Sequence, residues 1–176
     1  MITMRVENDP LNNLISDFLS KKQNIIGIEI GSYRGESTEL FIKSGAFSRL
    51  YCIDPWIPGY DPNDPAATTE IKQAEKEFDE RFKDNLTVVK IRQSSDASVG
   101  LFDDCSIDFV YIDGDHRFEY VRRDLLNYFP KVKHGGFIAG HDYHPAHPGV
   151  ILAVNEVFKT VPARLYPDYS WIYIKA

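Results

Sequence analysis

Five clusters of glycine or polar residues interrupt this chain, and each comes directly after a short apolar run. The clusters are Gly31-Ser32-Tyr33-Arg34-Gly35, Asp54, Ser94-Ser95-Asp96, Asp113-Gly114-Asp115-His116 and His141-Asp142. In parallel α/β sheets, ligands bind just beyond the carboxyl ends of the strands. If the apolar runs are strands of such a sheet, we expect the five clusters to converge along one rim and to form a single cleft for a cofactor and a reaction.

The first cluster has the composition of a loop that approaches a ligand closely. Gly31 and Gly35 let the backbone turn sharply, and the helix expected after them offers free N–H groups to an anionic or polar group. The spacing G-x-x-x-G lacks the middle glycine of the dinucleotide fingerprint G-x-G-x-x-G, which weakens the hypothesis of a nicotinamide cofactor. By itself this loop is a weak signal, because a simple tight turn has the same composition.

The second and third clusters contain residues that can bind a nucleoside. Asp54 lies about 20 residues beyond the glycine loop, where an acid can accept hydrogen bonds from both hydroxyls of a ribose. The alternative is an ordinary Asp-Pro turn, since Pro55 follows. A side chain of the Ser94-Ser95-Asp96 segment can bond an adenine edge or cap a helix, and the two roles are compatible.

The fourth and fifth clusters carry residue types suited to acid–base and metal chemistry. Asp113 and Asp115 are two residues apart, so both can face one site, and His116 can act as a base near neutral pH. The alternative is a helix start, where the helix dipole favours acids. Asp113, His141 and Asp142 together offer carboxylate oxygens and an imidazole nitrogen, a set that can hold Mg²⁺, Mn²⁺ or a transition metal. The histidine favours the softer ions.

These clusters need a sheet to bring them together, and the pattern of the chain predicts one. Short apolar runs alternate with longer amphipathic stretches, which is typical of strand–helix units around a parallel sheet. We predict strands at residues 25–30, 50–54, 87–91, 107–113 and 136–139, helices at 11–22, 36–44, 69–83, 95–102, 117–129 and 150–159, and two final antiparallel strands at 164–166 and 170–175. The predicted fold is a Rossmann-like, doubly wound α/β sheet, mostly parallel with a final antiparallel strand, in a single domain over residues 1–176.

Composition and charge limit the class of protein. Hydrophobic residues make up 43% and the formal net charge is -6, so the chain can form a core and is poorly suited to broad contact with nucleic acid or anionic lipid. No apolar run is long enough to span a membrane. Cys52 and Cys105 lie in or beside apolar runs and predict two buried thiols rather than a disulfide. With no visible secretory signal, we expect a cytoplasmic protein.

The order of these motifs resembles that of class I S-adenosylmethionine-dependent methyltransferases, in particular the bacterial branch of macrocin and other sugar O-methyltransferases. A more distant likeness is to catechol and caffeoyl-CoA O-methyltransferases. The likeness covers residues 25–158, and its more specific part is Ile112-Asp113-Gly114-Asp115-His116 with the later Gly140-His141-Asp142-Tyr143. The resemblance implies methyl transfer from S-adenosylmethionine to an oxygen atom of a small-molecule acceptor.

The resemblance also implies which residues hold the cofactor. The matching positions are Glu29, Gly31, Ser32, Gly35, Asp54, Ser94, Ser95, Asp96 and Asp113. The first four would surround the methionine part, Asp54 would bind the ribose hydroxyls, and residues 94–96 would lie near adenine.

For the reaction, the resemblance implies a metal site and a general base. In the metal-dependent members, the positions of Asp113, His141 and Asp142 hold a divalent ion. The first residue of the last pair is usually acidic, so the need for a metal stays open here. The base would be Asp115, as in the sugar enzymes, or His116, at the position of a lysine in the catechol enzymes.

Other classes of function remain as alternatives. An NAD(P)-dependent oxidoreductase would need the missing middle glycine, and a cofactor-binding protein without activity would not need the crowding of Asp113, Asp115, His116 and His141. A metal-dependent hydrolase is a weaker alternative. We expect no nucleic-acid or membrane partner, and a homo-oligomer is left open. A lid is expected from residues 56–69, from the loop after Asp142 or from another subunit.

Overall fold

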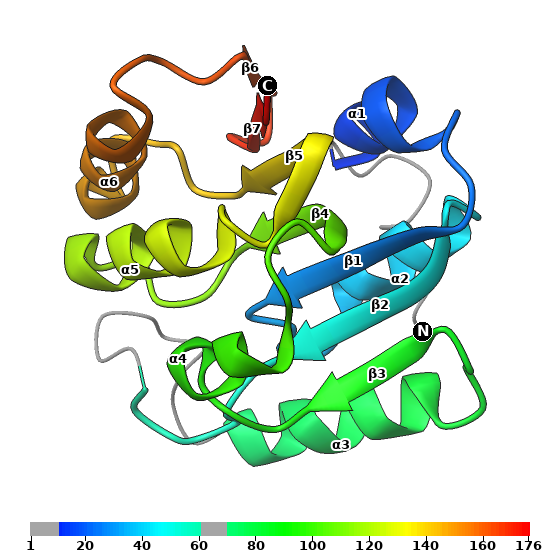
Figure 1. Cartoon of the computed structure of the whole chain (residues 1–176). Helices are drawn as coiled ribbons and strands as arrows, with labels where there is room; N and C mark the ends of the chain where they lie inside the picture. Colours follow the sequence, from blue (N-terminus) through cyan, green and yellow to red (C-terminus); the bar gives the residue numbers. More distant parts are fainter. Residues whose placement is uncertain (1–10, 61–69) are drawn as a thin grey trace.

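The central feature of the computed structural model, which describes residues 11–60 and 70–176, is a seven-stranded sheet (Figure 1). Its strands are β1 (Ile25–Ile30), β2 (Phe47–Ile53), β3 (Val88–Ile91), β4 (Ile107–Ile112), β5 (Val132–Gly140), β6 (Arg164–Leu165) and β7 (Trp171–Ile174). The order is β3-β2-β1-β4-β5-β7-β6. Strands β1 to β5 pair in parallel, and β7 pairs antiparallel with β5 and β6. The predicted mostly parallel, Rossmann-like sheet is confirmed.

Two strands begin earlier than the apolar pattern predicted. β2 starts at Phe47 and β5 at Val132, although exposed residues such as Arg49 and His134 follow these starts. The ladder is made by backbone groups, so polar side chains near the amino end of a strand interrupt the hydrophobic pattern without ending the strand. The central strands β1 and β4 are buried on both faces and match their predicted starts.

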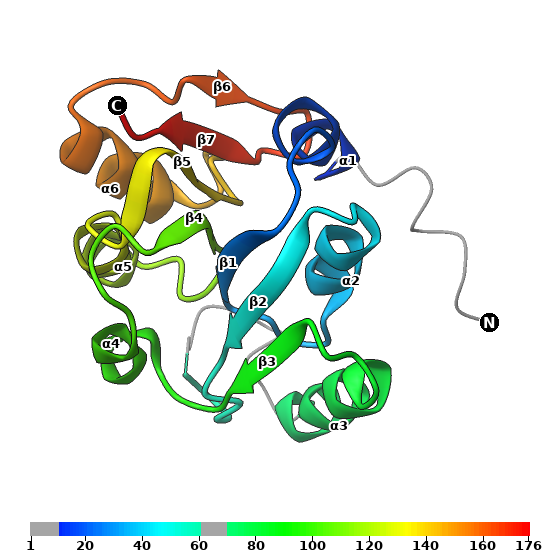
Figure 2. The same cartoon turned by 45° about the vertical axis from the view of Figure 1, so that its right-hand side comes forward.

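Helices cover both faces of the sheet (Figure 2). On one face lie α1 (Leu11–Leu14) with a π-helical segment (Ile15–Leu19), α2 (Glu36–Lys43) and α3 (Ile71–Phe82). On the other lie α4 (Ser95–Ser98) with a 3₁₀ turn (Val99–Leu101), α5 (Phe118–Tyr128) and α6 (Pro148–Phe158). Apart from α4, whose buried residues are Ser95 and Ser98, each helix buries apolar side chains against the strands. Two cores result, one on each side of the sheet.

Three expectations about the surface and the loops have different outcomes. Cys52 is buried, but Cys105 is exposed, so the prediction of two buried thiols is wrong for the second. Cys105 lies in the turn before β4 with φ of 54°, outside the apolar run that follows it. Residues 61–69, most of the predicted lid segment, lie outside the described residues.

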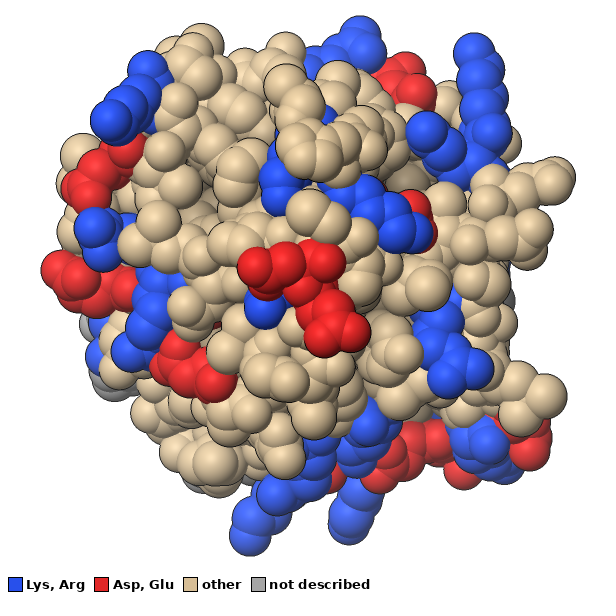
Figure 3. All heavy atoms as spheres, in the orientation of Figure 1, with Lys and Arg blue, Asp and Glu red and all other residues tan. Residues whose placement is uncertain are grey.

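Within residues 11–60 and 70–176, no helix combines the length and apolarity needed to cross a bilayer. On the face drawn in Figure 3, basic and acidic side chains are interspersed among other residues.

Candidate functional site

The carboxyl ends of the central strands are held together by hydrogen bonds that extend past the strands. The N–H groups of Gly31, Asp113 and His141 each donate to the last or next-to-last carbonyl of a neighbouring strand, at 2.9, 2.8 and 3.1 Å. Gly31 has φ of 86°, and a Cβ at this position would lie 2.0 Å from the Asp113 carbonyl oxygen. Only glycine fits this approach without a shift, so the glycine loop and the loop after β4 meet directly.

A cavity of about 810 Å³ opens at this rim. The predicted residues that line it are Gly31, Ser32, Asp54, Ser95, Asp113, Asp115, His116, His141 and Asp142. They come from loops after all five parallel strands, which lie side by side only because the sheet aligns their ends. The other four predicted site residues are described by the structure but do not line the cavity. They are Glu29, Gly35, Ser94 and Asp96.

Glu29 lies fully buried behind the glycine loop. Its carboxylate accepts hydrogen bonds from Ser32 Oγ at 2.9 Å, from Ser37 Oγ at 2.5 Å and from the Thr38 hydroxyl. Burial raises the pKa of Glu29, the three hydroxyls oppose that rise, and the charge of Asp113 adds to it. This carboxylate therefore holds the glycine loop to the start of α2, and any effect of Glu29 on a ligand passes through Ser32 and Ser37, which line the cavity.

The remaining predicted residues outside the lining have local structural roles. Gly35 begins α2 with φ of 80°, and a Cβ there would lie 2.3 Å from the Phe82 ring. Ser94 caps α4 by accepting from the Ala97 N–H, as the capping alternative predicted. Asp96 is treated below with the residues around it.

Asp54 joins the end of β2 to the glycine loop. Its Oδ2 accepts from the Tyr33 N–H at 3.0 Å and its Oδ1 from the Trp56 N–H at 2.7 Å. Burial raises the pKa of Asp54, while these two backbone hydrogen bonds lower it. A carboxylate has about four lone-pair sites, so Asp54 can still accept from a ligand on its cavity side.

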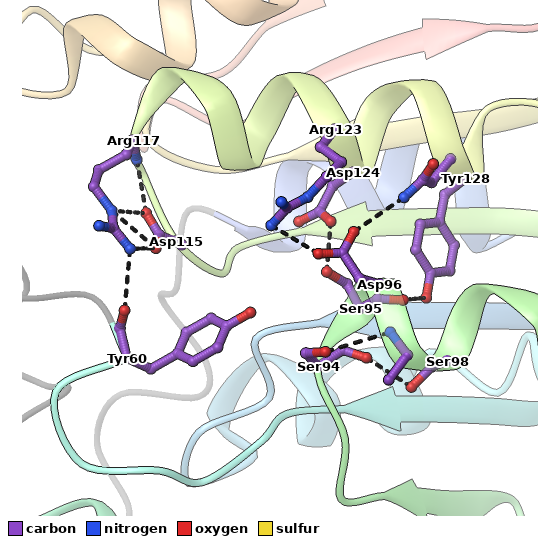
Figure 4. Close-up of polar contacts among 12 residues, drawn as sticks. Tyr60, Ser94, Ser95, Asp96, Ser98, Asp115, Arg117, Arg123, Asp124 and Tyr128 are labelled. Carbon is purple, nitrogen blue, oxygen red and sulfur yellow. Dashed lines mark hydrogen bonds and ion pairs between the residues drawn. The ribbon is translucent and has the colours of Figure 1, made fainter.

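Ser95 connects α4 to α5 at one end of the cavity (Figure 4). Its Oγ donates to Asp124 Oδ1 at 2.6 Å, and its carbonyl accepts from the Tyr128 hydroxyl at 2.7 Å. Asp124 is buried, and it also lines the cavity. Asp96 points elsewhere, since its oxygens meet Arg123 at 2.7 Å and Asn127 at 3.2 Å.

Asp115, a predicted base, is paired with Arg117 (Figure 4). The Arg117 Nε donates to Oδ1 at 2.9 Å and to Oδ2 at 3.0 Å, and Nη2 also contacts Oδ2. Arg117 Nη2 donates as well to the Tyr60 carbonyl at 3.1 Å. The pair thereby connects the loop before α5 to the segment after β2.

The other end of the cavity is a cluster of acids and histidines centred on Asp142. His116 Nε2 lies 2.9 Å from Asp142 Oδ2 and 3.7 Å from Asp113 Oδ1. His141 Nδ1 lies 3.2 Å from Asp142 Oδ2, and His147 Nε2 lies 3.5 Å from Asp142 Oδ1. Asp142 has φ of 58°, a conformation that aspartate tolerates better than most residues.

The cluster shifts the titration of its members. Burial disfavours the charged form of His116, but hydrogen bonds and attraction to Asp113 and Asp142 outweigh it and raise its pKa to about 10. The pKa of His141 rises to about 9, again against burial, mainly because of Asp142. Burial opposes ionisation of Asp142, yet the two histidines hold its pKa far below the usual range.

The same cluster contains a donor set for a metal ion. One atom each from Asp113, His141 and Asp142 lies within 4.8 Å of the other two. Two carboxylates and an imidazole suit divalent ions, and the imidazole favours transition metals and zinc over Mg²⁺. The residues present therefore fit a divalent ion.

Several cavity residues were missed by the sequence reasoning. These are Tyr120, Asp124, Asp168 and Tyr169. Asp124 did carry a signal, because it shares the buried face of α5 with Val121, Leu125 and Tyr128. An acid within an otherwise apolar helix stripe needs a partner. Asp168 and Tyr169 lie between the last two strands and had no comparable pattern.

The sheet order and the cavity at the strand ends define a Rossmann-like domain, and the cavity lies at the rim where such folds bind their ligands. A family of methyltransferase domains matches residues 28–143, about two thirds of the chain. The chain belongs to this family, and the predicted class I methyltransferase assignment is confirmed.

Comparison with individual proteins agrees with this fold. An uncharacterised protein of Acanthamoeba polyphaga mimivirus is 29% identical over 166 residues, covering 92% of this chain and 71% of that protein. The O-methyltransferase NovP has a TM-score of 0.62 at 18% identity, covering 98% of this chain and 79% of NovP.

Two further solved structures are longer proteins. Spermidine synthase from Thermotoga maritima has a TM-score of 0.60 at 13% identity, covering 88% of this chain and 54% of the synthase. An S-adenosylmethionine-dependent methyltransferase from Mesorhizobium loti has a TM-score of 0.56 at 13% identity, covering 80% of this chain and 56% of that enzyme. The chain thus spans about half the length of these two proteins, and the likeness concerns the fold.

Proposed function

We propose that this domain transfers the methyl group of S-adenosylmethionine to a hydroxyl oxygen of a small molecule, with a divalent metal ion bound by Asp113, His141 and Asp142. One observation carries the proposal. A single cavity joins the glycine loop and Asp54 to the acid–histidine cluster, so a cofactor and an acceptor can lie next to each other. Its volume of about 810 Å³ is ample for two small molecules.

The cofactor half of the cavity lies along β1, β2 and β3. Gly31 brings the backbone close to the ligand, and Ser32 and Asp54 place polar atoms on the wall beside it. S-adenosylmethionine supplies the electrophilic methyl group, and the protein supplies position and electrostatics. Most of the rate enhancement would come from holding the two reactants in line.

The reaction half of the cavity lies along β4 and β5. The acceptor oxygen forms a bond to the methyl carbon as the carbon–sulfur bond breaks, and the hydroxyl proton leaves to a protein base. Both oxygens of Asp115 accept hydrogen bonds from Arg117, whereas the His116 ring lines the cavity beside Asp113 and Asp142. Arg117 therefore leaves Asp115 poorly placed to take a proton. A cation held by Asp113 and Asp142 would weaken the attraction that keeps His116 protonated near neutral pH, so His116 would be the base when the ion is bound.

The metal part of the proposal rests on the donor set. Asp113, His141 and Asp142 would hold the ion, and His116 and His147 lie beside them. A divalent ion would supply Lewis-acid chemistry that lowers the pKa of an acceptor hydroxyl. The acceptor class is proposed from the likeness to the O-methyltransferase NovP and to sugar O-methyltransferases, so a sugar or natural-product hydroxyl is the substrate to test.

The test is direct binding followed by turnover. Calorimetry with S-adenosylhomocysteine and with NADH should show binding of the first alone. Titration with Mn²⁺, Co²⁺ and Mg²⁺ should show tighter binding of the first two. Labelled S-adenosylmethionine with a panel of sugars and phenols should then reveal a methylated oxygen.

A matched pair of variants separates the metal site from general effects of charge. Asp113→Asn should abolish metal binding, while Asp103→Asn, an exposed acid before β4, should leave it unchanged. Binding of NADH without S-adenosylhomocysteine would overturn the proposal. Undiminished metal binding by a folded Asp113→Asn variant would remove its metal part.

A further inference from the structure

The end of the cavity away from the acid–histidine cluster is built around Asp124 of α5. Ser95, Tyr60 and Tyr120 also line the cavity, and the Tyr60 and Tyr120 rings pack edge to face with centroids 6.4 Å apart. In Figure 4, Tyr60 lies below the Arg117–Asp115 pair, and its ring extends toward the side of the view where Ser95 is drawn. This end is therefore aromatic, with one buried acid in its wall.

One oxygen of Asp124 is used within the protein and the other faces the cavity. Oδ1 accepts from Ser95 Oγ at 2.6 Å, and within the described residues no donor contacts Oδ2. Asp124 is 4% exposed, and the cavity is the space that its second oxygen can reach. A ligand that enters the cavity displaces water from this oxygen, so the ligand must offer a donor there or leave a buried acceptor unpaired.

Asp96, the acid predicted to lie near adenine, is not available for this role. Its two oxygens meet Arg123 and Asn127, and it is not among the described residues that line the cavity. The acid that faces this end of the cavity is thus Asp124 of α5 instead of Asp96 of α4.

We propose that Asp124 Oδ2 accepts a hydrogen bond from the exocyclic amino group of the cofactor's adenine, which makes Asp124 the residue that selects this base. The inference rests on the proposed use of S-adenosylmethionine. Adenine offers an amino donor on its edge and flat apolar faces that suit Tyr60 and Tyr120. Hypoxanthine has a carbonyl oxygen at the same position, and two acceptors would then face each other.

The electrostatics around Asp124 add a pH dependence to this contact. Burial is the main reason that the pKa of Asp124 is raised to about 7. The negative charges of Asp96 and Asp115 also raise this pKa, while the Ser95 hydrogen bond and the positive charge of Arg123 lower it. The pKa values of the neighbouring Tyr60 and Tyr128 are raised by burial, so both phenols stay neutral near pH 7. An amino donor favours the ionised carboxylate, so binding should lower the pKa of Asp124 and release a proton.

The first experiment compares S-adenosylhomocysteine with S-inosylhomocysteine by calorimetry. The wild-type protein should prefer the adenosyl compound by about 10- to 100-fold, the usual effect of a buried acceptor left unpaired. Asp124→Ala should weaken binding of the adenosyl compound and bring the ratio close to one. Glu119→Gln, which changes an exposed acid of the same helix, should keep the wild-type ratio.

The second experiment uses the isosteric variant Asp124→Asn, in case Asp124→Ala fails to fold. Affinity of the wild-type protein for S-adenosylhomocysteine should rise by up to about 10-fold from pH 6 to pH 8, the limit for release of one proton from a group with a pKa near 7. The asparagine cannot ionise, so its variant should lose that rise.

The outcomes separate this inference from the proposed function. Absence of any binding of S-adenosylhomocysteine by the wild-type protein would contradict the proposed function itself. If the wild-type protein binds both compounds equally, or if Asp124→Asn keeps the wild-type pH profile, the assignment of Asp124 is overturned while the proposed function stands.

Discussion

Two regions of the sheet rim use acidic residues in opposite ways. At the end of β1, Glu29 is fully buried, and the hydroxyls of Ser32, Ser37 and Thr38 donate to its two oxygens. After β4 and β5, Asp113 and Asp142 are partly exposed to the cavity, and their protein partners are ionisable histidines.

The difference teaches how to separate structural acids from binding acids. The hydroxyls of Ser32, Ser37 and Thr38, from the glycine loop and α2, donate to Glu29, and its complete burial keeps it away from a ligand in the cavity. Histidine is a residue type that binds metal ions, so the histidines near Asp113 and Asp142 could share these carboxylates with the proposed ion. Asp124 is intermediate, because one of its oxygens is bonded and the other faces the cavity.

The largest effect is expected from removing the structural acid. Glu29→Ala leaves three hydroxyls without their acceptor in the core, and should lower the free energy of unfolding by about 4 kcal/mol. Urea denaturation measures this loss. At a temperature where the variant is folded, its affinity for S-adenosylhomocysteine should stay within about 3-fold of wild type. A large loss of affinity in a stable variant would show that Glu29 acts on the ligand instead.

The next effect concerns the binding acids. Asp142→Asn keeps the shape of the side chain, and asparagine tolerates the backbone φ of 58° at this position. The substitution removes the negative charge that contacts His116 and His141 and that would bind the proposed ion. We expect affinity for Mn²⁺ to fall by about 100-fold, close to the range for disturbed metal sites. The free energy of unfolding should also fall, though less than in Glu29→Ala, because Asp142 is the partner that stabilises the charged forms of His116 and His141. Calorimetry and denaturation on the same sample measure both. Normal metal affinity would place the ion elsewhere.

The smallest expected effect concerns Asp124 and is measured as a change in the free energy of unfolding with pH. The folded-state pKa of Asp124 is raised to about 7, so ionising this carboxyl group destabilises the fold. The destabilisation is absent at low pH and grows as the pH rises from about 4 to about 7. Relative to Asp124→Asn, the wild-type protein should lose stability over that window, with a slope of at most about 1.4 kcal/mol per pH unit. Parallel pH profiles of the two proteins would indicate that Asp124 is not desolvated.

Most of the fold could be predicted from the chain because its signals are local. Strands such as β4, with apolar residues over 107–112, are buried on both faces and read as continuous runs. Boundaries failed where this rule does not apply, as at the polar start of β5. The exposed Cys105 is a similar case, since one residue beyond an apolar run is enough to leave the core.

The site could be predicted only in part for the same reason. Positions after each strand were identifiable, and the structure brings nine of the predicted residues to one cavity: Gly31, Ser32, Asp54, Ser95, Asp113, Asp115, His116, His141 and Asp142. The partners of each acid come from distant segments, and no local pattern encodes them. The contact of Arg117 with Asp115 is an exception, because the two residues are only two positions apart. The hydrogen bond from Arg117 to the Tyr60 carbonyl follows the rule, because it joins distant segments.

The amino-acid pattern alone determined that polar residues end five parallel strands, because hydrophobic burial and turn chemistry act over a few neighbouring residues. The tertiary structure decided which acids meet the cavity and which are closed off. Asp96 and Asp124 illustrate this, since both lie near Ser95 and only the second faces the cavity. That choice depends on how α5 packs over α4, a contact between segments that are distant along the chain.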